Sequence, residues 1–388
     1  MTMKLWTWGL CGVAGLWALG CGGSSSSPTP DGGPPDGGLT SGNPIGLWVG
    51  GFYALTATEL AVSGSSPSPA DECSDPNSGA ATTPAAFDAQ GNLWLEQASD
   101  QALSIIEWTA AQLAAACSSG VPARTVTLQQ GGACGDLAEI SAFAFDPQGS
   151  LWLSFTDTAL LLGLSADQLQ STATVTPTYC LINGSSYAAA LSAPTGMAFD
   201  ASGNLWVANI FSVLEYTPAT LAGALLATGG SAIMPPPDAY LSTVASENAA
   251  QVDNAGLSAN FEYVAFDAAG NLWVSGENWT GDAGSNFIAE YPAAVLTTLG
   301  ASTTPTPAVT LIETEAQAAA FDVFFGPIAF DSAGNLFLGA GGQIFRYPAA
   351  NLTPSGSGAY DVDISDLPFL TGTSLVFNPI PSGLPINP

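Results

Sequence analysis

The apolar and polar positions of this chain follow one pattern that returns five times. Each copy has a short apolar run ending in Phe-Asp, two variable residues, Gly and a polar residue, and then Leu, an aromatic residue and an aliphatic residue. The copies occupy residues 87–95, 145–153, 199–207, 266–274 and 330–338. Self-similarity at a spacing of roughly 60 residues indicates a repeat architecture.

Each copy predicts a β-hairpin. Asp suits the first position of a type I turn because its carboxylate accepts backbone N–H groups, and Gly supplies the positive φ that re-enters the next strand. The Leu-aromatic-aliphatic run suits a half-buried strand. We therefore expect a structural, turn-capping role for the repeated aspartates, which are Asp88, Asp146, Asp200, Asp267 and Asp331.

Two further strands follow each hairpin. A segment that alternates apolar and polar residues, as in 212–216, ends in an aromatic residue or Leu, and another Leu follows five positions later. A fourth short strand is visible in several copies, as at 125–128 and 308–311. Four strands in each repeat predict one blade of a β-propeller. We expect the repeated aromatic position to pack between blades, and it holds Trp48, Trp94, Trp152, Trp206, Trp273 and Phe337.

The two ends of the repeat region complete a sixth blade. Residues 46–49 match the second strand of the pattern and lack a first strand, whereas residues 374–378 match a first strand and lack a second. Joining them predicts an all-β, six-bladed β-propeller over residues 44–388, with the closing blade shared by N- and C-terminal strands. This closure also removes two free sheet edges.

The repeated phrase resembles that of NHL-type six-bladed propellers, and more distantly those of gluconolactonase-like and virginiamycin-lyase-like propellers. Five similar copies make the resemblance specific for the architecture. Such folds carry unrelated activities, so the resemblance does not fix a function.

The first 43 residues have a different composition. Residues 1–20 hold one Lys and an apolar run that is too short for a membrane span, which predicts a signal peptide. Gly20-Cys21 resembles the lipobox of bacterial lipoproteins and predicts a lipid on Cys21; an ordinary secretory signal is the alternative. Residues 21–43, rich in Gly, Ser and Pro, predict a flexible tether. In that family, a residue such as Gly22 after the cysteine favours sorting to the outer membrane. We therefore expect an envelope protein that is anchored to the outer membrane, on the periplasmic or the surface face of that membrane.

The charge excludes several classes of function. The chain has 3 Lys and Arg, 32 Asp and Glu, and no His. So few basic residues exclude nucleic-acid binding and direct docking on anionic lipid, which leaves the lipid as the membrane contact. The lack of His excludes a Ser-His-Asp triad and an imidazole base. Virginiamycin-lyase-like propellers rely on His, so that activity does not carry over. We expect a monomer.

Four cysteines lie within the propeller region. An even number in an exported protein predicts two disulfides, with three connectivities open. One connectivity would place an equivalent disulfide in each of two adjacent blades, namely Cys73–Cys117 and Cys134–Cys180. In each pair, one cysteine precedes and the other follows the first-strand Phe of the blade. A metal site is the alternative, but no Cys-x-x-Cys spacing supports it.

Residues that break the repeat are the candidates for chemistry. Glu262 precedes the first strand of one blade, and Glu277, Asn278 and Asp282 follow its second strand. Asp136 and Glu139 hold a comparable position in another blade. Because the loops before the first strand and after the second open on one face, these oxygens could bind Ca²⁺. Gluconolactonase-like enzymes have a metal site of Glu, Asn and Asp near that mouth, and the resemblance extends to this chain only at the level of the fold. The alternative is that these carboxylates are solvated residues of exposed loops.

Three functions remain open. The leading hypothesis is a lipid-anchored binding or scaffold module with a protein or glycan ligand on a propeller face, without catalysis or cofactor. The alternative is a Ca²⁺-dependent lactonase or hydrolase that uses Glu262, Glu277 and Asn278. The third is a carbohydrate-binding propeller that uses Trp279, an aromatic residue outside the repeat position.

Overall fold

A computed structural model describes most of the repeat region. All described residues belong to one compact unit within residues 41–388. The described residues are 46–50, 53–56, 59–65, 71–72, 84–99, 102–115, 120–131, 134–137, 139–182, 191–224, 236–242, 259–278, 285–300, 305–312, 325–340, 342–353, 359–365, 367 and 374–378. The expected signal peptide, Cys21 and tether lie outside them.

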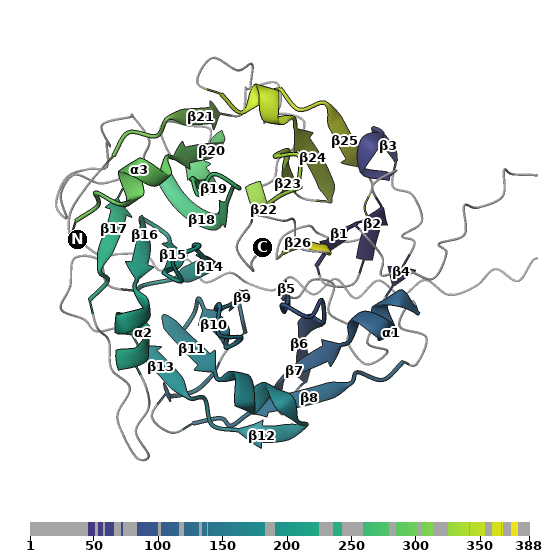
Figure 1. Cartoon of the computed structure of the whole chain (residues 1–388), viewed down its shortest axis with the longest axis vertical. Helices are drawn as coiled ribbons and strands as arrows, with labels where there is room; N and C mark the ends of the chain where they lie inside the picture. Colours follow the sequence, from purple (N-terminus) through teal and green to yellow (C-terminus); the bar gives the residue numbers. More distant parts are fainter. Residues whose placement is uncertain are drawn as a thin grey trace, which may run out of the picture. The chain divides into compact units, whose positions relative to one another are not determined.

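Six sheets, each built on four antiparallel strands, form the blades of a propeller (Figure 1). Blade one contains β5 (Ala85–Phe87), β6 (Leu93–Ser99), β7 (Ala102–Trp108) and β8 (Arg124–Leu128). Blade two contains β9 (Ala142–Phe145), β10 (Leu151–Phe155), β11 (Leu160–Leu164) and β13 (Tyr179–Ile182). Blade three contains β14 (Pro194–Phe199), β15 (Leu205–Asn209), β16 (Ser212–Tyr216) and β17 (Ala239–Ser242).

The other three blades follow the same order. Blade four contains β18 (Ala259–Phe266), β19 (Leu272–Asn278), β20 (Ser285–Tyr291) and β21 (Val309–Ile312). Blade five contains β22 (Phe325–Phe330), β23 (Leu336–Ala340), β24 (Gln343–Tyr347) and β25 (Val362–Ser365). Blade six contains β26 (Leu375–Asn378), β1 (Gly46–Val49), β2 (Tyr53–Thr56) and β4 (Asp71–Glu72). The inner strands β5, β9, β14, β18, β22 and β26 contact one another in sequence, and β26 contacts β5, which closes the ring.

Both chain ends build blade six, as the sequence predicts. β26 pairs with β1 in an antiparallel register that joins Gly46 to Asn378 and Val49 to Leu375. β1 then pairs with β2 on its other side. β1 therefore has a partner strand on both sides, and the pair β26–β1 joins the two ends of the ring.

Short helices connect the third and fourth strands of the blades. They are η1 (Glu59–Ala61), α1 (Ala110–Ala114), η3 (Ala166–Gln170), α2 (Pro218–Gly223), α3 (Ala293–Leu296) and η4 (Ala349–Asn351). Antiparallel order places them at the same end of the blades as the Asp-x-x-Gly turns. We call this end the turn face, and the opposite end, where the inner strands begin, the loop face.

Two blades carry a fifth strand that comes from the following blade. β12 (Ala173–Val175) pairs in parallel with β8 of blade one, and β3 (Gly64–Ser65) pairs in parallel with β25 of blade five. Each extra strand covers an outer edge that would otherwise expose unpaired backbone groups.

The aspartate of each turn has several hydrogen-bond partners. In blade three, Oδ1 of Asp200 accepts from the backbone N–H groups of Ser202 and Asn204, at 2.8 and 2.9 Å. Its Oδ2 accepts from Nδ2 of Asn204 at 2.8 Å and from Nε1 of Trp206 at 3.2 Å. Gly203 has a φ of 81°, which a residue with a side chain rarely adopts. The carboxylate thus caps the turn and also fixes the buried tryptophan.

The same aspartate–tryptophan bond recurs in three other blades. Its Nε1-to-Oδ2 distances are 3.1 Å for Trp94–Asp88, 3.3 Å for Trp152–Asp146 and 3.0 Å for Trp273–Asp267. In blade five, Phe337 replaces Trp, and Asp331 retains its bonds to the turn. The sequence predicts the turn caps but not the bond to the indole.

The repeated aromatic residues pack across blade boundaries. Five of the six make an edge-on contact with an aromatic residue of the inner strand of the next blade, with ring centroids 5.3–6.2 Å apart, in the pairs Trp48–Phe87, Trp94–Phe145, Trp206–Phe266, Trp273–Phe330 and Phe337–Phe377. Trp152 instead stacks on Tyr179 of its own blade. Edge-to-face contacts of this kind add to the free energy gained by burying the rings.

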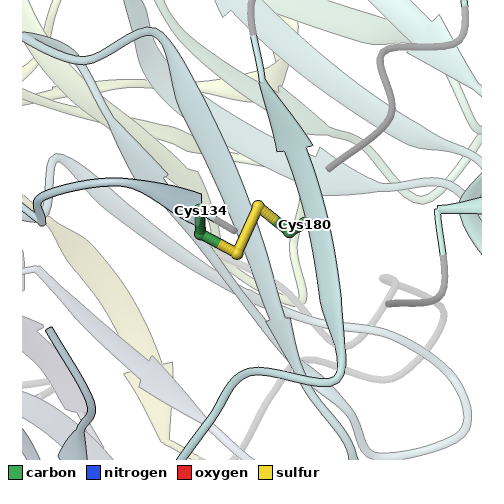
Figure 2. Close-up of a disulfide and its surroundings, with 2 residues drawn as sticks. All are labelled: Cys134 and Cys180. Atoms are coloured by element: carbon green, nitrogen blue, oxygen red, sulfur yellow. A yellow bond between two sulfur atoms is a disulfide. The ribbon is translucent and has the colours of Figure 1, made fainter. Parts of the chain in front are cut away.

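One of the two expected disulfides lies within the described residues. Cys134, before β9, is bonded to Cys180 in β13, with the Cα atoms 6.1 Å apart (Figure 2). This pairing is the one that the sequence predicts for blade two. Cys73 and Cys117 lie outside the described residues, so their pairing stays a prediction. In the part of the chain that the structure describes, no helix has the length and apolar character needed to span a membrane.

The repeated tryptophan of blade six differs in its hydrogen bonding from those of blades one to four. Nε1 of Trp48 is buried and has no hydrogen-bond partner among the described residues. The first and second strands of blade six come from opposite ends of the chain, so no hairpin turn joins them, and Asn378 stands at the aspartate position of the repeat.

We predict that Asn378→Asp raises the free energy of unfolding by about 1 kcal/mol, because a carboxylate would accept the Trp48 N–H. Urea denaturation in moderate salt measures the change. In a Trp48→Phe background the same substitution should give no gain, which a double-mutant cycle tests. An equal gain in both backgrounds would contradict the missing-acceptor explanation.

Candidate functional site

A small cavity of about 30 Å³ lies on the propeller axis. Two successive residues at each inner strand, or directly before it, line this cavity. They are Pro84 and Ala85, Ala142 and Phe143, Gly196 and Met197, Tyr263 and Val264, Pro327 and Ile328, and Ser374 and Leu375. A space of this size is close to the volume of one water molecule.

Glu262 and Glu277 lie in blade four, and Glu262 directly precedes Tyr263, which lines this cavity. Glu262 is the extra residue of a β-bulge in β18, where the pairing with β19 shifts between Phe261 and Tyr263. Glu277 in β19 pairs with Asn260 on one side and Asn286 on the other. The register therefore puts three polar residues in one row across three strands, with Glu262 close to the row.

The two carboxylates interact electrostatically. Burial, and then the charge of Glu277, raise the pKa of Glu262 to about 7. Burial and the charge of Glu262 also raise the pKa of the neighbouring Tyr263. A bound cation or a shared proton would relieve the repulsion between the two carboxylates.

The structure separates the other expected ligands from this pair. Glu139 and Asp136 are exposed residues of blade two, so they do not join the blade-four carboxylates. Asn278 ends β19 opposite Ala259 and Ser285, and nothing is described of its side chain. Asp282 and Trp279 lie outside the described residues. Across the described ranges, no group of three or more His, Cys, Asp or Glu residues is arranged to hold a metal ion.

A second carboxylate pair, which the sequence analysis missed, lies between blades one and two. Glu96 in β6 is only 3% exposed, and its Oε1 has no hydrogen-bond partner among the described residues. Burial and the charge of Glu139 raise the pKa of Glu96 to about 7, while the backbone N–H of Ile140 acts in the opposite direction.

Aligning the repeats would have shown that Glu96 is unusual. The corresponding residues of the next four blades are Ser154, Ala208, Ser275 and Gly339. Oγ of Ser275 donates to the carbonyl of Gly326 in the next blade at 2.8 Å. Oγ of Ser154 lies 3.0 Å from Oγ of Ser141 in its own blade, and Ser141 donates to the carbonyl of Pro194 in the next blade at 2.9 Å. Glu96 thus places an ionisable group at a position that holds neutral residues in the next four blades.

Comparisons with known proteins show neither a family nor a function for this chain. No protein family and no curated protein matches the chain. The extracellular domain of a protein assigned as a one component system from B. thetaiotaomicron is 11% identical, with 75% of this chain and 32% of that chain covered and a TM-score of 0.41. This chain therefore spans about a third of that protein's length.

Two other solved structures are similar at the same level. A protein assigned as a gluconolactonase is 15% identical, covers 66% of this chain and 69% of its own, and has a TM-score of 0.33. Virginiamycin B lyase from Staphylococcus aureus is 12% identical, covers 68% of this chain and 64% of its own, and has a TM-score of 0.34. Likenesses this low carry no argument about function.

We predict that Glu96 makes the folded state less stable as the pH rises. Its pKa is about 7 in the folded protein and 4.5 in the unfolded chain. Between these values the folded state binds more protons, so the free energy of unfolding falls with rising pH and levels off above about pH 7.

Glu96→Gln should reduce this fall by on the order of 2 kcal/mol. Urea denaturation from pH 4.5 to 8 measures it. Asp157→Asn, an exposed residue in the turn between β10 and β11, removes the same charge and should leave the slope nearly unchanged. Equal slopes for the wild type and Glu96→Gln would contradict the prediction.

Proposed function

We propose that this chain is a lipid-anchored cell-envelope protein whose propeller is a non-catalytic binding or scaffold module. Cys21 carries the lipid, residues 21–43 are the tether, and the propeller presents its faces to a protein or glycan ligand. The lipobox-like sequence at Cys21 and the flexible composition that follows it support the anchor.

One observation carries the proposal of a binding module. The described residues of the inner strands, most of them apolar, leave only about 30 Å³ on the axis. Sites for small molecules usually have several hundred Å³ of concave space. The described part of the axis therefore favours a ligand that engages a face of the ring, as suits a module that binds larger partners.

The anchor is tested by labelling cells that express the full chain with an alkyne fatty acid. The wild-type protein should incorporate the label and sediment with membranes, and Cys21→Ser should do neither. Cys11→Ser, which changes a cysteine inside the expected signal peptide, is the matched control and should behave as the wild type. Label in Cys21→Ser at the wild-type level would refute the anchor.

The second candidate function is a Ca²⁺-dependent lactonase or hydrolase. The interaction of Glu262 with Glu277, beside Asn260 and Asn286, favours it, because carboxylate and amide oxygens are ligands for Ca²⁺. Under this reading the two glutamates and Asn278 hold the ion near the end of the axis.

Thermal unfolding in EDTA, Mg²⁺ or Ca²⁺ separates the two functions. A site for Ca²⁺ predicts a saturable rise in the midpoint with Ca²⁺ and a smaller one with Mg²⁺. Glu262→Gln and Glu277→Gln should each remove the rise, whereas Glu139→Gln, in blade two, should not. Hydrolysis of simple lactones that depends on Ca²⁺ would then overturn the non-catalytic proposal, and equal midpoints in the three conditions would exclude the calcium enzyme.

A further inference from the structure

The two arginines of the propeller have the same structural role. Nη1 of Arg124 donates to the carbonyl of Leu169 at 3.3 Å, and Nη1 of Arg346 donates to the carbonyl of Leu60 at 3.1 Å. Leu169 and Leu60 occupy the same repeat position in the following blade. Both arginines thus join neighbouring blades at places where a parallel fifth strand is added.

The two arginines differ in the partners of their other guanidinium nitrogens, Nε and Nη2. Nε and Nη2 of Arg346 donate to the two carboxylate oxygens of Asp361, each at 2.8 Å, which is a bidentate ion pair. Arg124 is bonded to Oε1 of Glu107 at 3.1 Å through Nη1, the same nitrogen that bonds Leu169. Among the described residues, Nε and Nη2 of Arg124 have no partner, and its side chain is 33% exposed.

Arg124 lines a cavity of about 430 Å³ on the turn face, between blades one and two. The turns of both blades and η3 form its walls, with Gln90, Gln148 and Gln170 on the rim. The three glutamines are exposed. Nε2 of Gln170 donates to the carbonyl of Ala166 at 3.2 Å, which leaves its Oε1 as an acceptor. The volume is in the range of sites for small molecules.

The charge of the cavity selects the class of ligand. Asp88 and Asp146 line it, and their oxygens accept hydrogen bonds within their own turns. Glu107 already balances Arg124, so the surroundings carry a net negative charge that disfavours an anion. The arginine offers two adjacent donors, and each glutamine amide offers donors and an acceptor. A neutral molecule with several neighbouring hydroxyl groups matches this set.

We propose that the cavity between blades one and two binds a neutral carbohydrate. Nε and Nη2 of Arg124 donate to oxygens of adjacent hydroxyl groups, and the amides of Gln90, Gln148 and Gln170 bond to further hydroxyls at the rim. This site lies on the turn face, uses none of the loop-face carboxylates, and does not depend on the lipid anchor or on calcium.

Titration calorimetry and ligand-observed NMR with the full chain test the proposal. The neutral probes are glucose, galactose, mannose, N-acetylglucosamine, maltose, lactose and chitobiose, and glucuronate and galacturonate are the anionic probes. At least one neutral sugar should bind saturably. Arg124→Lys, which keeps the charge and loses the two-donor edge, should weaken it about tenfold or more.

Matched variants make the result specific. Arg346→Lys, at the arginine whose donors are already paired, should bind as the wild type. Gln148→Ala and Gln90→Ala change exposed side chains, so they keep the fold and should each weaken binding severalfold. These two variants keep the test decisive if Arg124→Lys fails to fold because Glu107 loses its partner.

Three outcomes would overturn the proposal. The first is that no neutral sugar binds saturably. The second is that only the uronates bind through Arg124, which would mean a carboxylate site. The third is that Trp279→Ala abolishes sugar binding while the Gln148 and Arg124 variants retain it, which would place the carbohydrate at Trp279.

Discussion

One carboxylate in each turn determines the geometry of a blade. The aspartate that ends an inner strand accepts two backbone N–H groups of the turn and, in blades one to four, the indole N–H of the next strand. Without that acceptor a buried indole would lose a hydrogen bond that it makes in water. In three of these blades the fixed tryptophan then packs against the inner strand of the following blade. The aspartate that caps a turn thereby also positions the side chain that packs between two blades.

Residues that depart from the repeat are the ones with side chains suited to binding or proton exchange. Glu96 replaces a neutral residue between blades, Glu262 occupies a bulge beside the axis, and Arg124 has donors that its counterpart Arg346 uses in an ion pair. Glu96 and Glu262 are recognised because the other blades show which residues stand at the same repeat position. Arg124 is recognised by comparison with Arg346, which also bonds the following blade but pairs these donors with Asp361. Comparison among the blades therefore provides an internal reference that a protein without repeats lacks.

The sequence predicted the blades, the closing strand pair and the Cys134–Cys180 disulfide correctly, because each depends on local patterns or on one repeated spacing. It missed the aspartate–indole bonds, the parallel strands β12 and β3, and the buried state of Glu96. These depend on how side chains of different strands or blades meet, and periodicity within one strand carries no information on that.

For the candidate site, the sequence chose Glu262 and Glu277 from a broken pattern, and the strand register explains their proximity. It also grouped Glu139 with them, although that residue pairs electrostatically with Glu96 in another part of the ring.

The pairing of β26 with β1 also has a consequence for the order of folding. β1 is among the first parts of the propeller to be synthesised, and its partner Leu375–Asn378 is among the last. Blade six cannot form until nearly the whole chain has been made, and until then the inner edge of β1 and the open sides of blades one and five lack their neighbours. Such long-range pairing slows folding and leaves sheet edges open to association while the ring is incomplete. A chain of this design gains from being kept unfolded until it is complete, as export in an unfolded state before folding would achieve.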